Sequence, residues 1–133
     1  MKKKLLTLVF CLIFSLVSFA QVNWYRTTSF AYKQKASYGW TNWSSWEKSN
    51  LQVSIDLDND ITKIYSNKTQ TYIVTEARDA YRDSGDGVTA EFGVIDQDYD
   101  RGTVRLRVER NGNSQIYVDF ANIMWVYNVV RIR

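Results

Sequence analysis

The sequence predicts an all-β fold, an antiparallel meander of about eight strands that most simply closes into a small up-and-down β-barrel. Apolar and polar residues alternate through most of the chain, as at Leu51, Val53, Ile55 and Leu57, and this is the pattern of a strand with one buried face. Short connections rich in Asp, Asn and Gly separate the alternating segments. The segments are also rich in Tyr, Val, Ile, Thr and Trp, the residues that favour strands.

The strands can be placed one after another along the chain. Alternation is clearest in three further segments, with these apolar members: Val88, Ala90, Phe92 and Val94; Val104, Leu106 and Val108; Ile116, Val118 and Phe120. The predicted strands cover residues 24–35, 49–57, 61–66, 70–78, 88–96, 103–110, 114–120 and 123–132. No linker, repeat or low-complexity run divides them, so residues 21–133 are expected to form a single β domain.

The short connections predict that strands adjacent in sequence pair with one another. An open meander of this size would leave two unpaired edges, and closure into a barrel removes them. A barrel is therefore the first choice, and a β-sandwich is the alternative.

The hairpin around Asn111 and Gly112 is specific enough to predict a register. A three-residue loop at 111–113 would place apolar residues opposite one another on the core face, in the pairs Val108–Ile116, Leu106–Val118 and Val104–Phe120. A two-residue loop would set apolar against polar residues, so the pattern favours the longer loop. The same register places Arg105 opposite Asp119 and Arg107 opposite Tyr117 on the outer face, as cross-strand contacts.

The first 20 residues are typical of a signal peptide. Lys2, Lys3 and Lys4 precede an apolar run from 5 to 19, and Ser18 and Ala20 are the small residues that a signal peptidase recognises. The run is short for a membrane span, although an uncleaved membrane anchor is the alternative. We expect cleavage after Ala20 and export to the periplasm or the extracellular space, most readily in a bacterium.

Removal of residues 1–20 changes the composition of the chain. It removes three of the 17 Lys and Arg and none of the 14 Asp and Glu, so the remaining 113 residues have no net charge. No basic surface is then expected for nucleic acid. Cys11 is lost and the chain contains no His, which excludes catalytic triads with His, Cys nucleophiles and ordinary zinc sites. We expect no cofactor and no membrane span in the processed chain.

The segment 39–46 is the first candidate site because Trp40, Trp43 and Trp46 recur in it every third residue, with Tyr38 just before it. This spacing fits neither a strand nor an amphipathic helix, so it predicts a structured loop. Tryptophans there can stack on sugars or hold apolar partners. The alternative is a loop that folds over the barrel mouth and seals the core. Among the three, we expect Trp46 to be the most buried and Trp40 the most exposed.

Two acidic runs alternate carboxylates with other residues, as the start of a calcium-binding loop does. They comprise Asp56, Asp58 and Asp60, and Asp96, Asp98 and Asp100. Neither run has the glycine and glutamate that complete such a loop. Both follow predicted strands, where Asp and Asn form turns. We therefore predict hairpin tips and no metal site, with weak calcium binding as the alternative.

Several motifs together resemble a group of small exported bacterial β-proteins of unassigned function. They are the W-x-x-W-x-x-W loop, the segment 27–33, and the C-terminal DF-x-x-x-MWVYN segment at 119–128. This resemblance implies no particular activity. A more distant architectural likeness is to lipocalin-type barrels, in which Trp24 and Arg131 would pack together to close one end.

These observations favour an exported, non-catalytic binding or interaction module for a glycan or an apolar or peptide ligand at the tryptophan-rich loop, or for a protein partner. The 17 aromatic residues of the processed chain suit such a role. Two alternatives remain. One is a small hydrolase of glycans that uses a pair of carboxylates, and the other is a structural component of a surface assembly.

Overall fold

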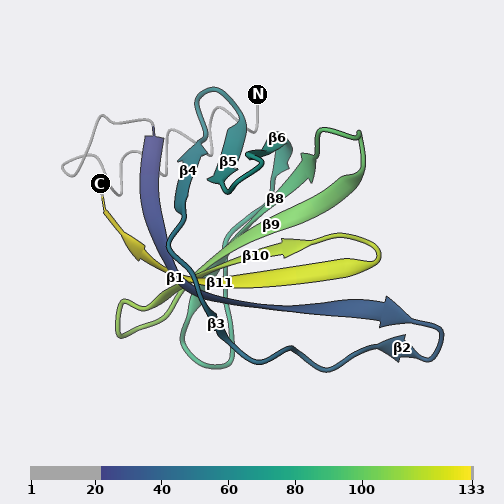
Figure 1. Cartoon of the computed structure of the whole chain (residues 1–133). Helices are drawn as coiled ribbons and strands as arrows, with labels where there is room; N and C mark the ends of the chain where they lie inside the picture. The colour runs from purple at the N-terminus through teal and green to yellow at the C-terminus, as the bar shows by residue number, and fades with distance from the viewer. Residues whose placement is uncertain (1–21, 133) are drawn as a thin grey trace.

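Residues 22–132 are described by a computed structural model, in which they form a closed antiparallel β-barrel (Figure 1). The predicted signal peptide, residues 1–20, lies outside the described residues. The strands are β1 (Val22–Ala36), β2 (Gly39–Trp40), β3 (Glu47–Lys48), β4 (Gln52–Asp56), β5 (Ile61–Tyr65), β6 (Gln70–Ala77), β7 (Tyr81–Arg82), β8 (Val88–Ile95), β9 (Arg101–Val108), β10 (Ser114–Asp119) and β11 (Ile123–Arg131). No helix of residues 22–132 is long and apolar enough to cross a membrane.

Eight strands make the barrel wall in the order β11-β10-β9-β8-β6-β5-β4-β1, and β1 pairs with β11 to close it. Every wall pairing is antiparallel, and every one except the closing β1–β11 pair joins wall strands that follow one another in the chain once the small strands β2, β3 and β7 are set aside. The prediction of a meander closed into a barrel is confirmed, and the sandwich alternative is wrong. All eight predicted strands occur within a few residues of their expected bounds.

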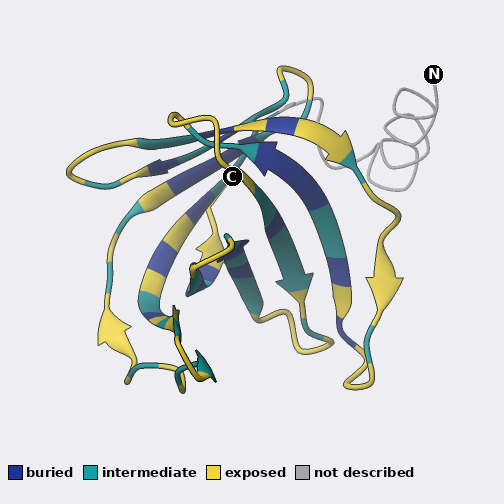
Figure 2. Ribbon diagram, turned by 90° about the vertical axis from the view of Figure 1, so that its right-hand side faces the viewer, coloured by how far each residue is buried: buried dark blue, intermediate teal, exposed yellow. Residues whose placement is uncertain are grey.

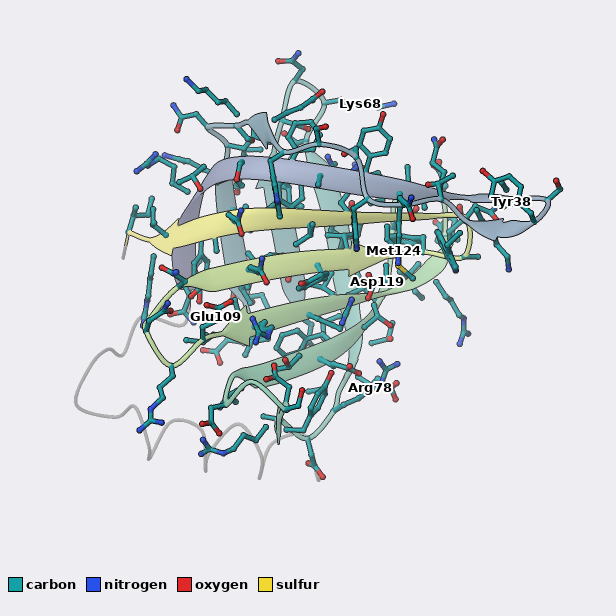
Figure 3. All side chains as sticks on the ribbon, turned by 90° about the horizontal axis from the view of Figure 1, so that it is seen from below. Tyr38, Lys68, Arg78, Glu109, Asp119 and Met124 are labelled. Carbon is teal, nitrogen blue, oxygen red and sulfur yellow. The ribbon has the colours of Figure 1, made fainter. Side chains whose placement is uncertain are left out.

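β1 is the longest strand, with 15 residues, and the segment from β2 to β4 lies antiparallel beside it. β2, β3 and β4 pair with it in succession, and the buried Thr27 joins the irregular part of that segment to β1. Its Oγ1 accepts a hydrogen bond from the Leu51 backbone N–H at 2.7 Å and lies 2.8 Å from the Ser49 hydroxyl oxygen. The β1–β2 hairpin projects beyond the barrel (Figure 1), with Tyr38 near its tip (Figure 3).

The core consists of inward-facing side chains of the eight wall strands. Val53, Ile64, Val104 and Ile116 are completely buried within it, and all except Ile64 belong to the alternating segments that the sequence singled out. In Figure 2 the buried stretches lie along the wall strands, while the turns and the outlying strands are mostly exposed. Burial of these aliphatic side chains supplies the driving force for folding, in a part of the chain that has no cysteine.

The register predicted for the β9–β10 hairpin is wrong by two residues. Val104 lies opposite Val118, and Leu106 opposite Ile116, so the faces are as predicted but the partners are not. The cause is the loop, which occupies 110–112: Glu109 N–H donates to the Asn113 carbonyl, and Gly112 has a φ of 91°. Glycine adopts this left-handed conformation at little cost, so it fixes where the three-residue loop ends.

Arg131 lies opposite Tyr25 in the β1–β11 pairing, and the Ile132 backbone N–H donates to the Trp24 carbonyl. Tyr25 is buried in the core, so the adjacent Trp24 faces the other side of the strand, where its ring stacks on Tyr65 with the ring centres 5.8 Å apart. Strand alternation thus separates Trp24 from the face that Arg131 shares with Tyr25.

Candidate functional site

The larger cavity of the barrel lies at its mouth, at the end where the β8–β9 and β10–β11 turns meet the start of β6. It has a volume of about 550 Å³, within the roughly 300–1,000 Å³ range of small-molecule sites. Tyr72, Phe120 and Trp125 supply its aromatic lining. The rings of Tyr72 and Phe120 meet across the barrel with their centres 5.9 Å apart.

Gly102 makes room for this aromatic lining. A Cβ atom at Gly102 would lie 2.7 Å from the Asp119 carbonyl oxygen and 2.8 Å from the Phe120 ring, both too close for any side chain. The Phe120 ring therefore lies over β9 only because position 102 carries no side chain. Glycine at this position is required by close approach, not by an unusual φ.

Neutral polar groups line the inner end of the mouth. The Tyr72 hydroxyl donates to Gln70 Oε1 at 2.6 Å. Burial, reinforced by the neighbouring Tyr127 and Asp96, raises the pKa of Tyr72, and burial also raises the pKa of Tyr127. Both phenols therefore stay protonated at physiological pH. The mouth offers a ligand aromatic faces and uncharged hydrogen-bonding groups.

The rim of the mouth is acidic. Asp96, Asp98 and Asp100 line it together with the single cation Arg101. Asp96 also organises the β8–β9 turn, because its Oδ1 accepts the backbone N–H groups of Asp98 and Asp100, each at 2.9 Å. This run is thus a hairpin tip, as predicted, and it also borders the cavity.

The other acidic run lies at the opposite end of the barrel, in the β4–β5 turn. Asp56 Oδ1 accepts the Asn59 backbone N–H at 3.1 Å, its Oδ2 accepts the Asn59 side-chain amide at 2.9 Å, and Asp60 has a φ of 56°. These are the bonds of a turn. Within residues 22–132, no three acidic side chains converge in a geometry that could hold a metal ion.

The tryptophan-rich loop does not seal the barrel, and this correction concerns all three tryptophans. Residues 41–46 run alongside β1, with backbone hydrogen bonds from Thr41 to Gln34 and from Ser44 to Tyr32. None of the three belongs to the buried core. The predicted order of burial is also wrong: Trp46 is the most exposed at 51%, Trp43 is 40% exposed, and Trp40 is less exposed than either.

Trp40 and Trp43 are brought together by Lys33. The Lys33 ammonium lies 5.6 Å from the Trp40 ring centre and 4.7 Å from that of Trp43, a cation–π arrangement. Tyr38 is 80% exposed at the hairpin tip. The four candidate residues therefore do not form one platform.

Trp43 covers part of the outer barrel wall. Its ring lies edge-on to Tyr117 of β10, with the ring centres 6.4 Å apart. The wall between them is the cross-strand row Ala31–Val126–Tyr117. Ala31 and Val126 face outwards, yet only 1% and 3% of their surfaces are exposed. Trp43 thus forms a small apolar cluster outside the barrel.

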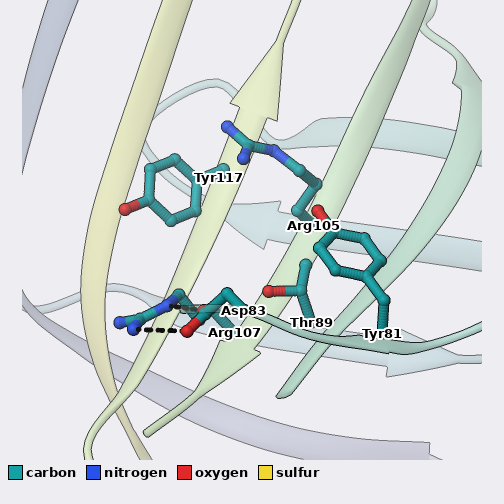
Figure 4. Close-up of a pocket in the computed structure, with 6 residues that line it drawn as sticks. All are labelled: Tyr81, Asp83, Thr89, Arg105, Arg107 and Tyr117. Carbon is teal, nitrogen blue, oxygen red and sulfur yellow. Dashed lines mark hydrogen bonds and ion pairs between the residues drawn. The ribbon is translucent and has the colours of Figure 1, made fainter. Parts of the chain in front are cut away.

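A second, smaller pocket of about 230 Å³ lies farther along the outer wall (Figure 4), lined by Tyr81, Asp83, Thr89, Arg105, Arg107 and Tyr117. Its charged groups are held in ion pairs. Arg107 donates from Nε to Asp83 at 2.6 Å and from Nη1 to Glu109 at 2.7 Å, and Arg105 donates from Nε to Asp119 at 2.7 Å. The predicted Arg105–Asp119 contact exists, but as a diagonal pair, because Arg105 lies opposite Tyr117 and Arg107 opposite Gln115.

Sequence reasoning named the acidic turn of the mouth and three outer-wall residues, but it identified neither cavity and missed the aromatic lining of the mouth. Alternation places Tyr72 and Phe120 on the core face, but it does not show which end of the barrel stays open. Asp83 follows β7 and Thr89 belongs to β8, and the pairing of these two strands brings both residues to the outer pocket. No protein-family model, curated protein or solved structure significantly matches this chain, so the resemblance to small exported proteins stays a prediction.

Proposed function

We propose that this protein is an exported, non-catalytic binding module that takes a small apolar or amphipathic ligand into the barrel mouth. The observation that carries this proposal is the cavity of about 550 Å³ lined by Tyr72, Phe120 and Trp125. A concave, largely aromatic cavity with a few polar groups is the usual form of a small-molecule site. The site differs from the tryptophan-rich loop that the sequence favours.

The lining supports an apolar body for the ligand. Aromatic side chains bury large areas, and the Tyr72 phenol that lines the cavity is uncharged. Gln70 can donate or accept one hydrogen bond to a polar group of the ligand. The ligand is therefore expected to enter with its apolar end first.

The acidic rim favours a ligand whose outer, polar end is neutral or cationic. Three carboxylates, those of Asp96, Asp98 and Asp100, face one guanidinium, that of Arg101. An anionic head group would meet a net negative rim and would be repelled. The proposed ligand class is thus neutral or amine-bearing amphiphiles.

The carboxylate-based hydrolase is the weaker alternative for this cavity. A glycosidase needs two carboxyl groups on opposite sides of the scissile bond, about 5–9.5 Å apart depending on mechanism. The acidic residues of the mouth all come from one turn, 96–100. This arrangement favours recognition over hydrolysis.

Two fluorescent probes of matched shape test the proposal: N-phenylnaphthylamine, which is neutral, and anilinonaphthalene sulfonate, which is anionic. We expect saturable enhancement of the neutral probe and weaker binding of the sulfonate. Phe120→Ala and Trp125→Ala should each weaken the neutral probe by about tenfold or more, which corresponds to about 1.4 kcal/mol of lost contact energy.

Trp46→Ala is the matched control, because it removes an exposed aromatic side chain away from the cavity. Its probe affinity should equal that of the parent protein. Unsaturable enhancement, or affinity unchanged in both mouth variants while their unfolding midpoints stay normal, would refute the proposal.

A further inference from the structure

The pocket on the outer wall is lined by the hydroxyl-bearing side chain of Thr89. Thr89 is 3% exposed, and it lies between Tyr81 of β7 and Arg107 of β9 in the strand register. Within residues 22–132 the one fully buried side-chain group without a partner is the Thr62 hydroxyl, so the Thr89 hydroxyl is open to the pocket that it lines. Figure 4 shows the hydroxyl turned towards the other lining side chains. A hydroxyl can both donate and accept a hydrogen bond, so this group is available to a polar ligand in the pocket.

The pocket is rigid because its charged side chains are already paired. Asp83 Oδ1 accepts the backbone N–H groups of Gly85 and Gly87, at 2.9 Å and 3.1 Å, while its carboxylate also binds Arg107. Gly87 permits this packing, because a Cβ atom there would lie 2.9 Å from Asp83 Oδ2 and 3.0 Å from the Arg107 guanidinium. A ligand would therefore meet side chains that lose little freedom on binding.

The charge balance excludes a preference for anions. Arg105 and Arg107 each bind at least one carboxylate, and together they contact three, those of Asp83, Glu109 and Asp119. A guanidinium has five N–H donors, and Asp119 accepts from only two of those of Arg105. The walls thus present hydrogen-bond donors and acceptors without excess positive charge.

The aromatic walls add apolar surface. The Arg105 guanidinium lies 4.3 Å from the Tyr117 ring centre, and the Tyr81 hydroxyl donates to Glu91 at 2.8 Å. This hydrogen bond raises the pKa of Tyr81, so its phenol remains neutral beside the pocket. A ring with polar edges and apolar faces would match these walls.

We propose that this pocket binds one neutral sugar ring, with the Thr89 hydroxyl bonded to a sugar hydroxyl group. Its volume of about 230 Å³ is below the roughly 300 Å³ at which drug-sized sites begin, so it suits a single ring or the terminal ring of a glycan. This site does not depend on the mouth proposal, because the two cavities have no lining residue in common.

Saturation-transfer NMR and calorimetry with the methyl glycosides of glucose, galactose, mannose and N-acetylglucosamine test this site. We expect at least one to bind in the millimolar range, and the corresponding uronate to bind more weakly. Thr89→Val keeps the shape of the side chain and removes the hydroxyl, so the affinity should fall by about tenfold. Thermal unfolding of the variant should resemble that of the parent.

Thr71→Val is the matched control, because it removes a hydroxyl from the mouth cavity and should leave glycoside affinity unchanged. Tyr81→Ala provides a second variant of the outer pocket and should also weaken binding. The proposal is overturned if no glycoside binds, if Thr89→Val binds as the parent does, or if the uronates bind more tightly. Loss of binding in Thr71→Val alone would place the sugar in the mouth and likewise overturn it.

Discussion

The two cavities both draw residues from β9, but one opens at the end of the barrel and the other lies on the outer wall, and they are organised differently. β9 begins at the mouth with Arg101, Phe120 follows β10 there, and the two strands supply Arg105 and Tyr117 to the outer pocket. The mouth depends on close packing, since the Tyr72 and Phe120 rings lie against each other and the Phe120 ring lies over Gly102. The outer pocket is formed by paired charges that hold the β7 segment to the barrel. One site should therefore respond to changes in volume and the other to changes in charge.

Gly102→Ala is expected to have the largest effect, and it tests the packing of the mouth. The new methyl group would clash with the Phe120 ring and with the Asp119 backbone carbonyl, and the backbone cannot move without disturbing the β9–β10 ladder. Overpacking of this kind costs about 1–3 kcal/mol. We expect a lower unfolding midpoint and loss of naphthylamine binding, measured on the same sample.

Gly93→Ala is the control for Gly102→Ala. The nearest atom to a Cβ at Gly93 is Cγ of Glu76, at 2.9 Å, and this exposed, flexible side chain can move away. Its effect on stability should be smaller and probe binding should persist. Equal losses in both variants would mean that the glycine at 102 has no special role in the mouth.

Trp43→Ala should have the next largest effect, because it uncovers the apolar cluster on the outer wall. Replacing a completely buried Trp by Ala lowers the free energy of unfolding by about 3–5 kcal/mol, but Trp43 is 40% exposed. We therefore expect a loss of about 1–2 kcal/mol in denaturant unfolding. Trp46→Ala should stay within about 0.5 kcal/mol of the parent. The reverse order would restore the sequence-based prediction that Trp46 is the buried one.

Thr62→Val is expected to stabilise the barrel interior. Thr62 is fully buried, and its Oγ1 has no hydrogen-bond partner within residues 22–132. Replacing an unsatisfied hydroxyl by a methyl group of the same shape should raise the free energy of unfolding by about 1 kcal/mol. Thr27→Val is the matched control, since Thr27 is equally buried but hydrogen-bonded to Leu51 and Ser49, and it should destabilise. Destabilisation by both would indicate that Thr62 has a partner such as an internal water.

The sequence predicted the barrel well because strand pairing follows a local, period-two signal. It failed where the outcome depends on contacts across strands. Gly112 ends its loop one residue earlier than the apolar pattern alone suggested, and this moved every pair of the hairpin by two residues. The exposure of Trp46 likewise depends on how the chain beside β1 is held by Thr27 and Ser44. Neither contact leaves a periodic trace in the sequence.

The smallest expected effect concerns the charge-paired outer pocket and its dependence on pH. The hydrogen bond from Arg107, assisted by the backbone N–H groups of Gly85 and Gly87, lowers the pKa of Asp83 from 3.8 to about 2. A lowered pKa in the folded state adds stability that is fully present above the unfolded-state value and is lost as the pH falls through the folded value. Asp83→Asn should therefore be less stable than the parent at neutral pH, and the difference should shrink between pH 3.8 and about 2.

Asp86→Asn is the control, because the ion pair of Asp86 with Arg110 is longer, at 3.6 Å, and both side chains are largely exposed. Urea unfolding of both variants across this pH range measures the difference, and a gap between Asp83→Asn and the parent that does not change with pH would show that the Asp83 carboxylate is not what holds β7 to the wall.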